Sequence, residues 1–181
     1  VVYGTAASPE VVVFSATNDG YLHAVDGDTG VELWSFIPKQ LLTDLPDLML
    51  DSVSTYKHYG IDGDIVPVVA DLNDNGMRRG GNTLFSLDVT DKDNPKLNWA
   101  KTYPEWGETW ARPVVSRVDM NSTAFDSANT TLKAVVVVAE GYDTVHDTAA
   151  LPATADNQGA GISMLDLFSG DRVWRAGRSN A

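Results

Sequence analysis

The feature that most constrains the fold of this chain is an internal repeat of a strand, a turn and a second strand. The first strand of each copy runs between aliphatic residues and closes with an aspartate, and the second strand carries a tryptophan. The aspartate-closed strands are Leu22–Asp26, Leu84–Asp88 and Ile162–Asp166, and the tryptophans that follow them are Trp34, Trp99 and Trp174. The first and third copies have the same Asp-to-Trp spacing, and the second has a longer turn. Since such a unit cannot bury both of its faces alone, the repeat predicts small antiparallel sheets that stack on one another.

The two marked residues of each copy have separate predicted roles. An aspartate at a strand end accepts hydrogen bonds from the amides of the following turn, and a tryptophan supplies a large apolar plate between neighbouring sheets. Five aspartates lie at the turns of the first two copies: Asp26, Asp28, Asp88, Asp91 and Asp93. We interpret them as turn caps, and the alternative is that two or three of them hold a cation.

The remainder of the chain is also predicted to form mainly β-strands. Short runs rich in Val, Leu, Phe and Tyr alternate with clusters of Gly, Asp and Asn, which is the pattern of strands joined by turns. Residues 38–59 are the exception, because their leucines have roughly helical spacing that Pro46 interrupts. We therefore predict an all-β chain, and the alternative to stacked blades is a plain β-sandwich.

The predicted architecture is a partial, modified β-propeller of about three to four blades with long inter-blade loops. The whole chain, residues 1–181, is one propeller fragment, and its blade-like units lie near residues 10–37, 64–103, 110–140 and 160–176. Blades of roughly 40 residues make this too short for an ordinary closed propeller. Because an open sheet edge attracts other strands, we expect missing chain, a second copy or a neighbouring protein to cover it.

Composition and motifs exclude several functional classes. The formal net charge of −12 disfavours nucleic acid and anionic membranes as partners, since both need clustered Lys and Arg. The absence of cysteine excludes a disulfide framework, a thiolate zinc site and a cysteine nucleophile. No apolar stretch reaches the roughly 18 residues of a membrane span, and the longest, Ala134–Ala139, has the length of a strand. No Gly-rich phosphate loop, Gly-x-Ser-x-Gly elbow or His-Glu-x-x-His motif occurs.

The ends of the chain suggest a piece of something longer. It starts at Val1 without an initiator methionine or a visible signal peptide, and it stops at Ala181 just after a predicted hairpin. We therefore expect a mature or excised fragment, from which a targeting segment could have been lost.

Five segments carry a family resemblance when they are taken in order. The longest is Asn18–Pro38, which runs Asn-Asp-Gly-Tyr-Leu-His-Ala-Val-Asp-Gly-Asp-Thr-Gly-Val-Glu-Leu-Trp-Ser-Phe-Ile-Pro. The others are Tyr59–Asp64 with Pro67, Leu87–Asp91 with Asn94 and Pro95, Thr109–Pro113, and Glu140–Tyr142. Together they resemble the PilY family, the tip-associated adhesins of type IV pili, over most of the chain. One such motif would be weak evidence, whereas five in the family's order are specific.

The resemblance implies a modified β-propeller at the C-terminal end of a large secreted protein, with roles in pilus biogenesis, retraction control, twitching motility and surface adhesion. It implies an extracellular or cell-surface location, at the pilus tip or outer membrane, reached through the periplasm. The implied partners are the remainder of the same large protein, pilins or minor pilins, and a host or abiotic surface. Calcium dependence is also implied, but the family's Asp-rich calcium loop follows the hairpin that resembles Ile162–Trp174, where this chain ends.

The chain departs from the family pattern after Asp71. Family members have a Trp-bearing strand and a Gly-rich stretch before the segment that matches Leu87–Asp91, whereas residues 73–81 here are much shorter. We therefore expect an outer strand to be missing from this blade.

The polar segment that starts at Asp71 is the candidate calcium site. Oxygen ligands at its first, third and fifth positions and Gly76 at its sixth follow the spacing of an EF-hand-type loop. The predicted ligands are Asp71, Asn73, Asn75 and Met77. Arg79 and Asn82 argue against the site, because they stand where further ligands, including a bidentate Glu, are expected. The alternative is a polar hairpin loop.

Four aromatic residues are candidates for a sugar- or peptide-binding surface: Tyr103, Trp106, Trp110 and Tyr142. Trp110 belongs to the Thr109–Pro113 motif, and we predict that it packs in the core. Trp106 lies close to Pro104 and Gly107, and we predict that Trp106 and Tyr103 form the exposed binding surface.

The long loop after Glu140 holds candidate polar ligands. Asp143, His146 and Asp147 are candidates for hard-metal ligands or for a base with an orienting acid, and the alternative is a solvated loop. The remaining polar candidates have structural interpretations: buried, hydrogen-bonded histidines for His23 and His58, and an ion pair of Arg112 with Asp62 or Asp64.

These observations favour a non-enzymatic surface or pilus-tip module that acts through binding, without catalytic residues. The alternative is a fragment of a quinoprotein-type (PQQ) dehydrogenase propeller, whose repeats share the Leu-x-Ala-Leu-Asp, Thr-Gly and Trp pattern. Such an enzyme needs calcium and a quinone pocket with charged ligands, which the sequence does not assemble. A further alternative is an outer-membrane assembly scaffold with the same propeller.

Overall fold

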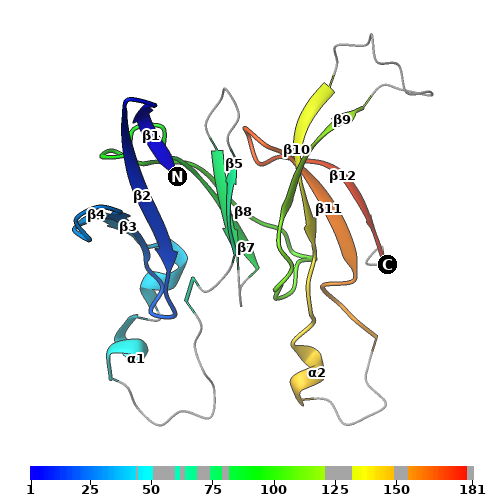
Figure 1. The fold of residues 1–181 in the computed structure, drawn as a ribbon. Helices are drawn as coiled ribbons and strands as arrows, with labels where there is room; N and C mark the ends of the chain where they lie inside the picture. The colour runs from blue at the N-terminus through cyan, green and yellow to red at the C-terminus, as the bar shows by residue number, and fades with distance from the viewer. Residues whose placement is uncertain are drawn as a thin grey trace.

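The computed structural model describes residues 1–43, 45–50, 60–61, 64–68, 74–78, 82–120, 132–148 and 155–178. Within these ranges the strands form three four-stranded antiparallel sheets, and in each sheet the strands follow one another in chain order. The second sheet lies between the first and the third (Figure 1). The chain is therefore nearly all β and propeller-like, as predicted.

The first sheet contains β1 (Val2–Thr5), β2 (Ser8–Ala16), β3 (Leu22–Asp26) and β4 (Glu32–Phe36). The second contains β5 (Asp64–Val68), β6 (Asp74–Arg78), β7 (Thr83–Asp88) and β8 (Lys96–Thr102). The third contains β9 (Val114–Asp119), β10 (Leu132–Ala139), β11 (Gly161–Asp166) and β12 (Arg172–Gly177). Three short helices complete the described elements: η1 (Lys39–Thr43), α1 (Leu45–Leu50) and α2 (Val145–Thr148). No helix in the described ranges is long and apolar enough to cross a membrane.

Within the second sheet, β7 is packed on both faces, which explains its nearly continuous burial. On one face, Leu84 and Trp99 pack with Val136 and Leu165 of the third sheet. On the other face, Leu87 packs with residues of the first sheet. Since alternate residues of a strand point to opposite faces, the alternating side chains of β7 supply both interfaces.

The aspartates that close the repeated strands cap the following turns. Asp26 Oδ1 accepts hydrogen bonds from the amides of Asp28 and Thr29 at 3.1 and 2.7 Å. Asp88 Oδ1 accepts from the amide of Thr90 at 3.0 Å. The third copy repeats the pattern, with Asp166 Oδ1 accepting from Phe168 and Ser169 at 2.9 and 3.0 Å. The turn-cap interpretation holds for these residues.

The repeated tryptophans connect neighbouring sheets. The Trp34 indole nitrogen in β4 donates to the carbonyl of Lys92, in the β7–β8 turn, at 2.7 Å. The Trp99 indole nitrogen in β8 donates to the carbonyl of Leu167, in the β11–β12 turn, at 3.0 Å. Each of these two tryptophans therefore packs its ring between neighbouring sheets and donates a hydrogen bond to the turn of the next sheet.

Two sequence predictions about organisation need correction. The units near residues 110–140 and 160–176 form one sheet, because β10 pairs with β9 on one side and with β11 on the other. The segment predicted as a polar loop contains β6, which pairs with both β5 and β7. The second sheet therefore has four strands, and the expectation of a missing outer strand is wrong.

Candidate functional site

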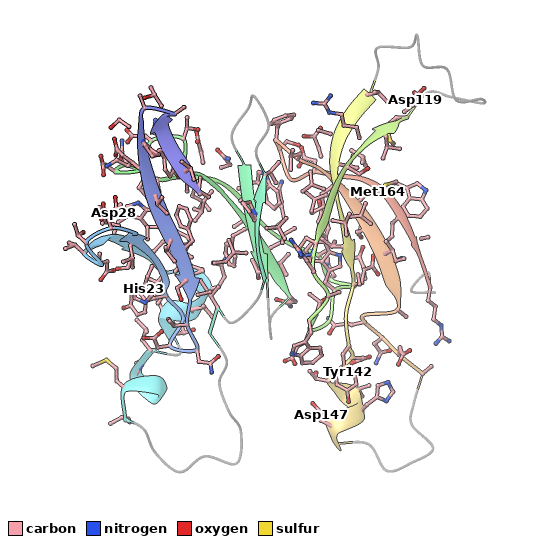
Figure 2. The ribbon with its side chains drawn as sticks, in the orientation of Figure 1. His23, Asp28, Asp119, Tyr142, Asp147 and Met164 are labelled. Carbon is pink, nitrogen blue, oxygen red and sulfur yellow. The ribbon has the colours of Figure 1, made fainter. Side chains whose placement is uncertain are left out.

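Two of the PilY-like motifs, Thr109–Pro113 and Glu140–Tyr142, meet at one end of the third sheet. Glu108, the residue before the first motif, forms an isolated antiparallel bridge with Tyr142 of the second: the Glu108 amide donates to the Tyr142 carbonyl at 2.9 Å, and the reverse bond measures 2.5 Å. A third segment joins them where the Gly159 amide donates to the Glu105 carbonyl at 2.9 Å. Figure 2 shows Tyr142 and Asp147 at this end of the sheet, beside α2.

Glycines allow these segments to approach this closely. A Cβ on Gly107 would lie 2.0 Å from the Tyr142 carbonyl oxygen. A Cβ on Gly141 would lie 2.1 Å from the Glu108 carbonyl oxygen, and Gly141 also has a positive φ of 97°. Side chains are excluded at both positions, so the bridge is sterically specified by glycine.

A buried ion pair lies beneath the bridge. Glu140 is fully buried, and its carboxylate accepts two hydrogen bonds from the Arg175 guanidinium, from Nε and Nη2, each at 2.7 Å. The Ser163 hydroxyl donates to Glu140 Oε1 at 2.7 Å. This hydrogen bonding to Glu140 raises the pKa of Arg175. A buried carboxylate satisfied in this way ties the end of β10 to β11 and β12.

The predicted binding surface of Trp106 and Tyr103 is wrong. Trp106 is fully buried, its indole nitrogen donates to Ser163 Oγ at 3.3 Å, and the Tyr103 ring packs edge-on at 4.9 Å. Tyr103 is half-buried and lies under the Arg172 guanidinium, 4.4 Å from its ring centroid. The Trp106 ring belongs to the core between the second and third sheets.

Trp110, for which the sequence predicts a place in the core, is instead 52% exposed. Its ring centroid lies 6.2 Å from that of Tyr142, which is 36% exposed. The Tyr142 centroid lies in turn 6.0 Å from that of His146. We call these three residues the aromatic platform.

The loop that follows the platform is anchored by Asp143. Its carboxylate is buried and accepts hydrogen bonds from the amides of Val145, Asn157 and Gln158 at 3.0, 2.6 and 3.1 Å. These backbone hydrogen bonds, Val145 foremost, lower the pKa of Asp143. Asp143 is thus neither a solvated residue nor a free metal ligand, because its oxygens organise the loop.

His146 and Asp147 have separate partners. His146 Nε2 pairs with Asp156 Oδ1, and the Tyr142 hydroxyl donates to Asp147 Oδ1 at 2.9 Å. The hydrogen bond to Asp147, followed by burial and the charges of nearby carboxylates, raises the pKa of Tyr142. Burial and the charge of Asp147 raise the pKa of Glu108. The surface therefore joins exposed rings to a cluster of acids, an arrangement suited to binding.

The calcium-loop prediction falls partly on β6. Asn75 and Met77 belong to this strand, whose backbone pairs on both sides, whereas Asp71 and Asn73 lie outside the described residues. A paired, extended strand does not provide the turning backbone of an EF-hand-type loop, so these two residues do not fit that geometry. Elsewhere in the described ranges, no group of three or more His, Cys, Asp or Glu side chains has a metal-binding arrangement.

The remaining polar predictions have mixed outcomes. His23 is half-buried, with Nδ1 3.2 Å from Glu32 Oε1, which supports a structural role. His58 lies outside the described residues. Asp62 and the side chain of Asp64 also lie outside them, so the ion pair of Arg112 with one of these two residues stays a prediction.

Sequence reasoning missed the Glu140–Arg175 pair and the exposure of Trp110. A signal for the first was present, because Glu140 directly follows the apolar run of β10. A signal for the second was the pair of glycines, Gly107 and Gly141, in two adjacent motifs.

Comparison with known proteins finds PilY1 proteins among the relatives of this chain. No protein-family model matches the chain. The chain is 34% identical over 175 residues to the type IV pilus biogenesis factor PilY1 of Pseudomonas aeruginosa strain UCBPP-PA14, covering 90% of this chain and 14% of the relative. It is 37% identical over 120 residues to the PilY1 homolog of Xylella fastidiosa, covering 59% of this chain and 9% of that protein.

The crystal structure of the P. aeruginosa PilY1 C-terminal domain is similar, with a TM-score of 0.54 and 26% identity. The match covers 96% of this chain and 31% of that structure. The chain thus spans 9% to 14% of the length of these curated relatives. These matches do not favour the quinoprotein alternative. The three sheets, the five ordered motifs and these similarities agree, and the chain belongs to the PilY family as part of the C-terminal region of its members.

Proposed function

We propose that this chain is a non-enzymatic, extracellular module of a type IV pilus biogenesis factor, and that it acts by presenting a binding surface. The relatives are named as type IV pilus biogenesis factors. The observation that carries the binding role is the aromatic platform, which two family-like motifs build and leave exposed. Pilins, minor pilins and the surface to which the cell adheres are the partners we propose for the whole protein.

The chemistry of the platform supports binding over catalysis. His146 pairs with Asp156, and the Tyr142 hydroxyl donates a hydrogen bond to Asp147. Asp143 accepts three backbone hydrogen bonds. Each of these polar groups has a structural partner, and a nucleophile activated by a neighbouring base is not found in the described part of the site.

The test is made in the full-length protein in its own cell. Trp110→Ala should abolish or strongly reduce twitching motility and surface pili while the protein accumulates at its normal level. Phe168→Ala is the matched control, because Phe168 is an exposed aromatic residue in the β11–β12 turn, at the opposite end of β11. If Trp110→Ala leaves pili and twitching at the level of the control, the platform has no part in pilus function.

A further inference from the structure

The aromatic platform presents rings to solvent in an unusual local setting. Trp110 and Tyr142 are both exposed, and the ring centroids of Trp110, Tyr142 and His146 follow one another at 6.2 and 6.0 Å. Exposed aromatic faces carry negative electrostatic potential and attract cations held over them. The geometry therefore offers one of the two elements of a cation site.

Carboxylates supply the second element. Asp147 Oδ1 accepts a hydrogen bond from the Tyr142 hydroxyl at 2.9 Å, and Glu108 pairs through its backbone with Tyr142. Glu108 in turn experiences the charge of Asp147. The basic group that acts on Asp143, His146, is already paired with Asp156. The platform therefore has an excess of negative charge that a bound cation would offset.

The surface is also held in place before any ligand arrives. The Glu108–Tyr142 bridge fixes the two segments that carry Trp110 and Tyr142, and Asp143 fixes the loop that carries His146 through three hydrogen bonds. A preorganised surface loses little conformational freedom on binding. Contacts of a ligand with the rings and the acids therefore need not offset the cost of ordering this surface.

We infer that the aromatic platform binds lysine or arginine side chains of a basic segment in a partner protein. A cationic side chain uses both elements at once, with its charge over the Trp110 or Tyr142 ring and its donors toward the carboxylates of Glu108 and Asp147. A neutral sugar is less well matched, because it carries no positive charge to offset that of the carboxylates. The inference rests on the proposed binding function and adds the chemical class of the ligand.

The probe is a blocked peptide with two lysines separated by glycines, titrated into the purified full-length protein by calorimetry. A peptide with glutamates in place of the lysines is the control ligand. Trp110→Ala should weaken lysine-peptide binding by about 2- to 30-fold, the size of a cation–π contact, and Trp110→Phe should lose less. Added salt should also weaken binding. Phe168→Ala should bind as the unchanged protein does, and equal thermal unfolding of all variants confirms that they are folded.

The outcomes separate this inference from the proposed function. Equal binding of the lysine and glutamate peptides, or unchanged lysine-peptide binding by Trp110→Ala, overturns the cationic ligand. If Trp110→Ala stops twitching but leaves lysine-peptide binding intact, the pilus function stands and this inference fails. If binding is lost while twitching persists, the cation site stands and the pilus role of the platform fails.

Discussion

At the scale of single residues, aspartates of the same type have different tasks because of what surrounds them. Asp26 and Asp88 cap exposed turns, whereas Asp143 is buried and holds two segments of a loop together. In all three, hydrogen bonds to the ionised carboxylate lower its pKa: from the Thr29 side chain for Asp26, the Thr90 side chain for Asp88 and the Val145 amide for Asp143.

These lowered pKa values predict how stability depends on pH. The unfolded chain binds protons at the ordinary aspartate pKa of about 3.9, and the folded chain binds them only at lower pH. The stabilisation should therefore be fully present above about pH 5 and should fall as the pH drops through the lowered pKa values. The measurement is the urea midpoint between about pH 6 and pH 3. Asp26→Asn should flatten this dependence, and a midpoint that rises on acidification would contradict the assignment.

Glycine offers a second residue-scale prediction, with a matched control in the same chain. Gly141 and Gly30 both have positive φ, 97° and 71°. An added Cβ at Gly141 would lie 2.1 Å from a backbone oxygen, whereas nothing lies within 4 Å of that position at Gly30. Gly30→Ala should cost about 1 kcal/mol of unfolding free energy, from the left-handed conformation alone. Gly141→Ala should cost at least about 2 kcal/mol, because the bridge must also move. Equal losses in chemical denaturation would show that the close approach is unimportant.

At the scale of elements, short hairpins can be predicted from local sequence, whereas a central strand such as β6 forms only because other strands pair with it. The β3–β4 and β11–β12 hairpins could be predicted because turn, cap and alternation lie within a few residues of one another. β6 could not, since its polar sequence resembles a loop and its place between β5 and β7 depends on partners on both sides. Strand pairing outweighed local propensity here.

The position of β6 bears on calcium. Because Asn75 and Met77 lie in a paired strand, we expect calcium to leave the melting temperature of the chelator-treated chain unchanged. Differential scanning calorimetry with increasing calcium provides the measurement. A rise in melting temperature that Asp71→Asn removes would instead support the predicted loop.

At the scale of the whole molecule, the sheets are joined by one repeated contact. Trp34 donates to a turn carbonyl of the second sheet, and Trp99 donates to a turn carbonyl of the third. Trp174 has the equivalent position in β12 and is 44% exposed. At the other end of the stack, the turn of the first sheet leaves Gly30 open, whereas the equivalent Gly170 lies against Trp99. The third sheet thus presents an exposed tryptophan, Trp174, and the first sheet presents a turn on which no tryptophan packs at Gly30.

We therefore expect a further sheet of the full-length protein to dock on Trp174 through a turn carbonyl. Trp174→Phe removes only the donor and part of the ring, so it should destabilise the full-length protein by about 1 kcal/mol. The same substitution in the isolated chain, where the residue is exposed, should change its unfolding free energy by less than about 0.5 kcal/mol. Equal effects in both would indicate that no further sheet, second copy or neighbour covers this face.

Four properties of this chain could be predicted from its residues alone: its β-class, its repeated hairpins, their aspartate caps and its family. Each of these depends on residues close together in the chain or on motifs read in order. Tertiary structure alone decided that the last two predicted units form one sheet, that Trp106 is buried and Trp110 exposed, and that Glu140 pairs with Arg175. The reason is physical: exposure and pairing depend on which distant segments meet, and at the platform that is decided by backbones in contact across Gly107 and Gly141.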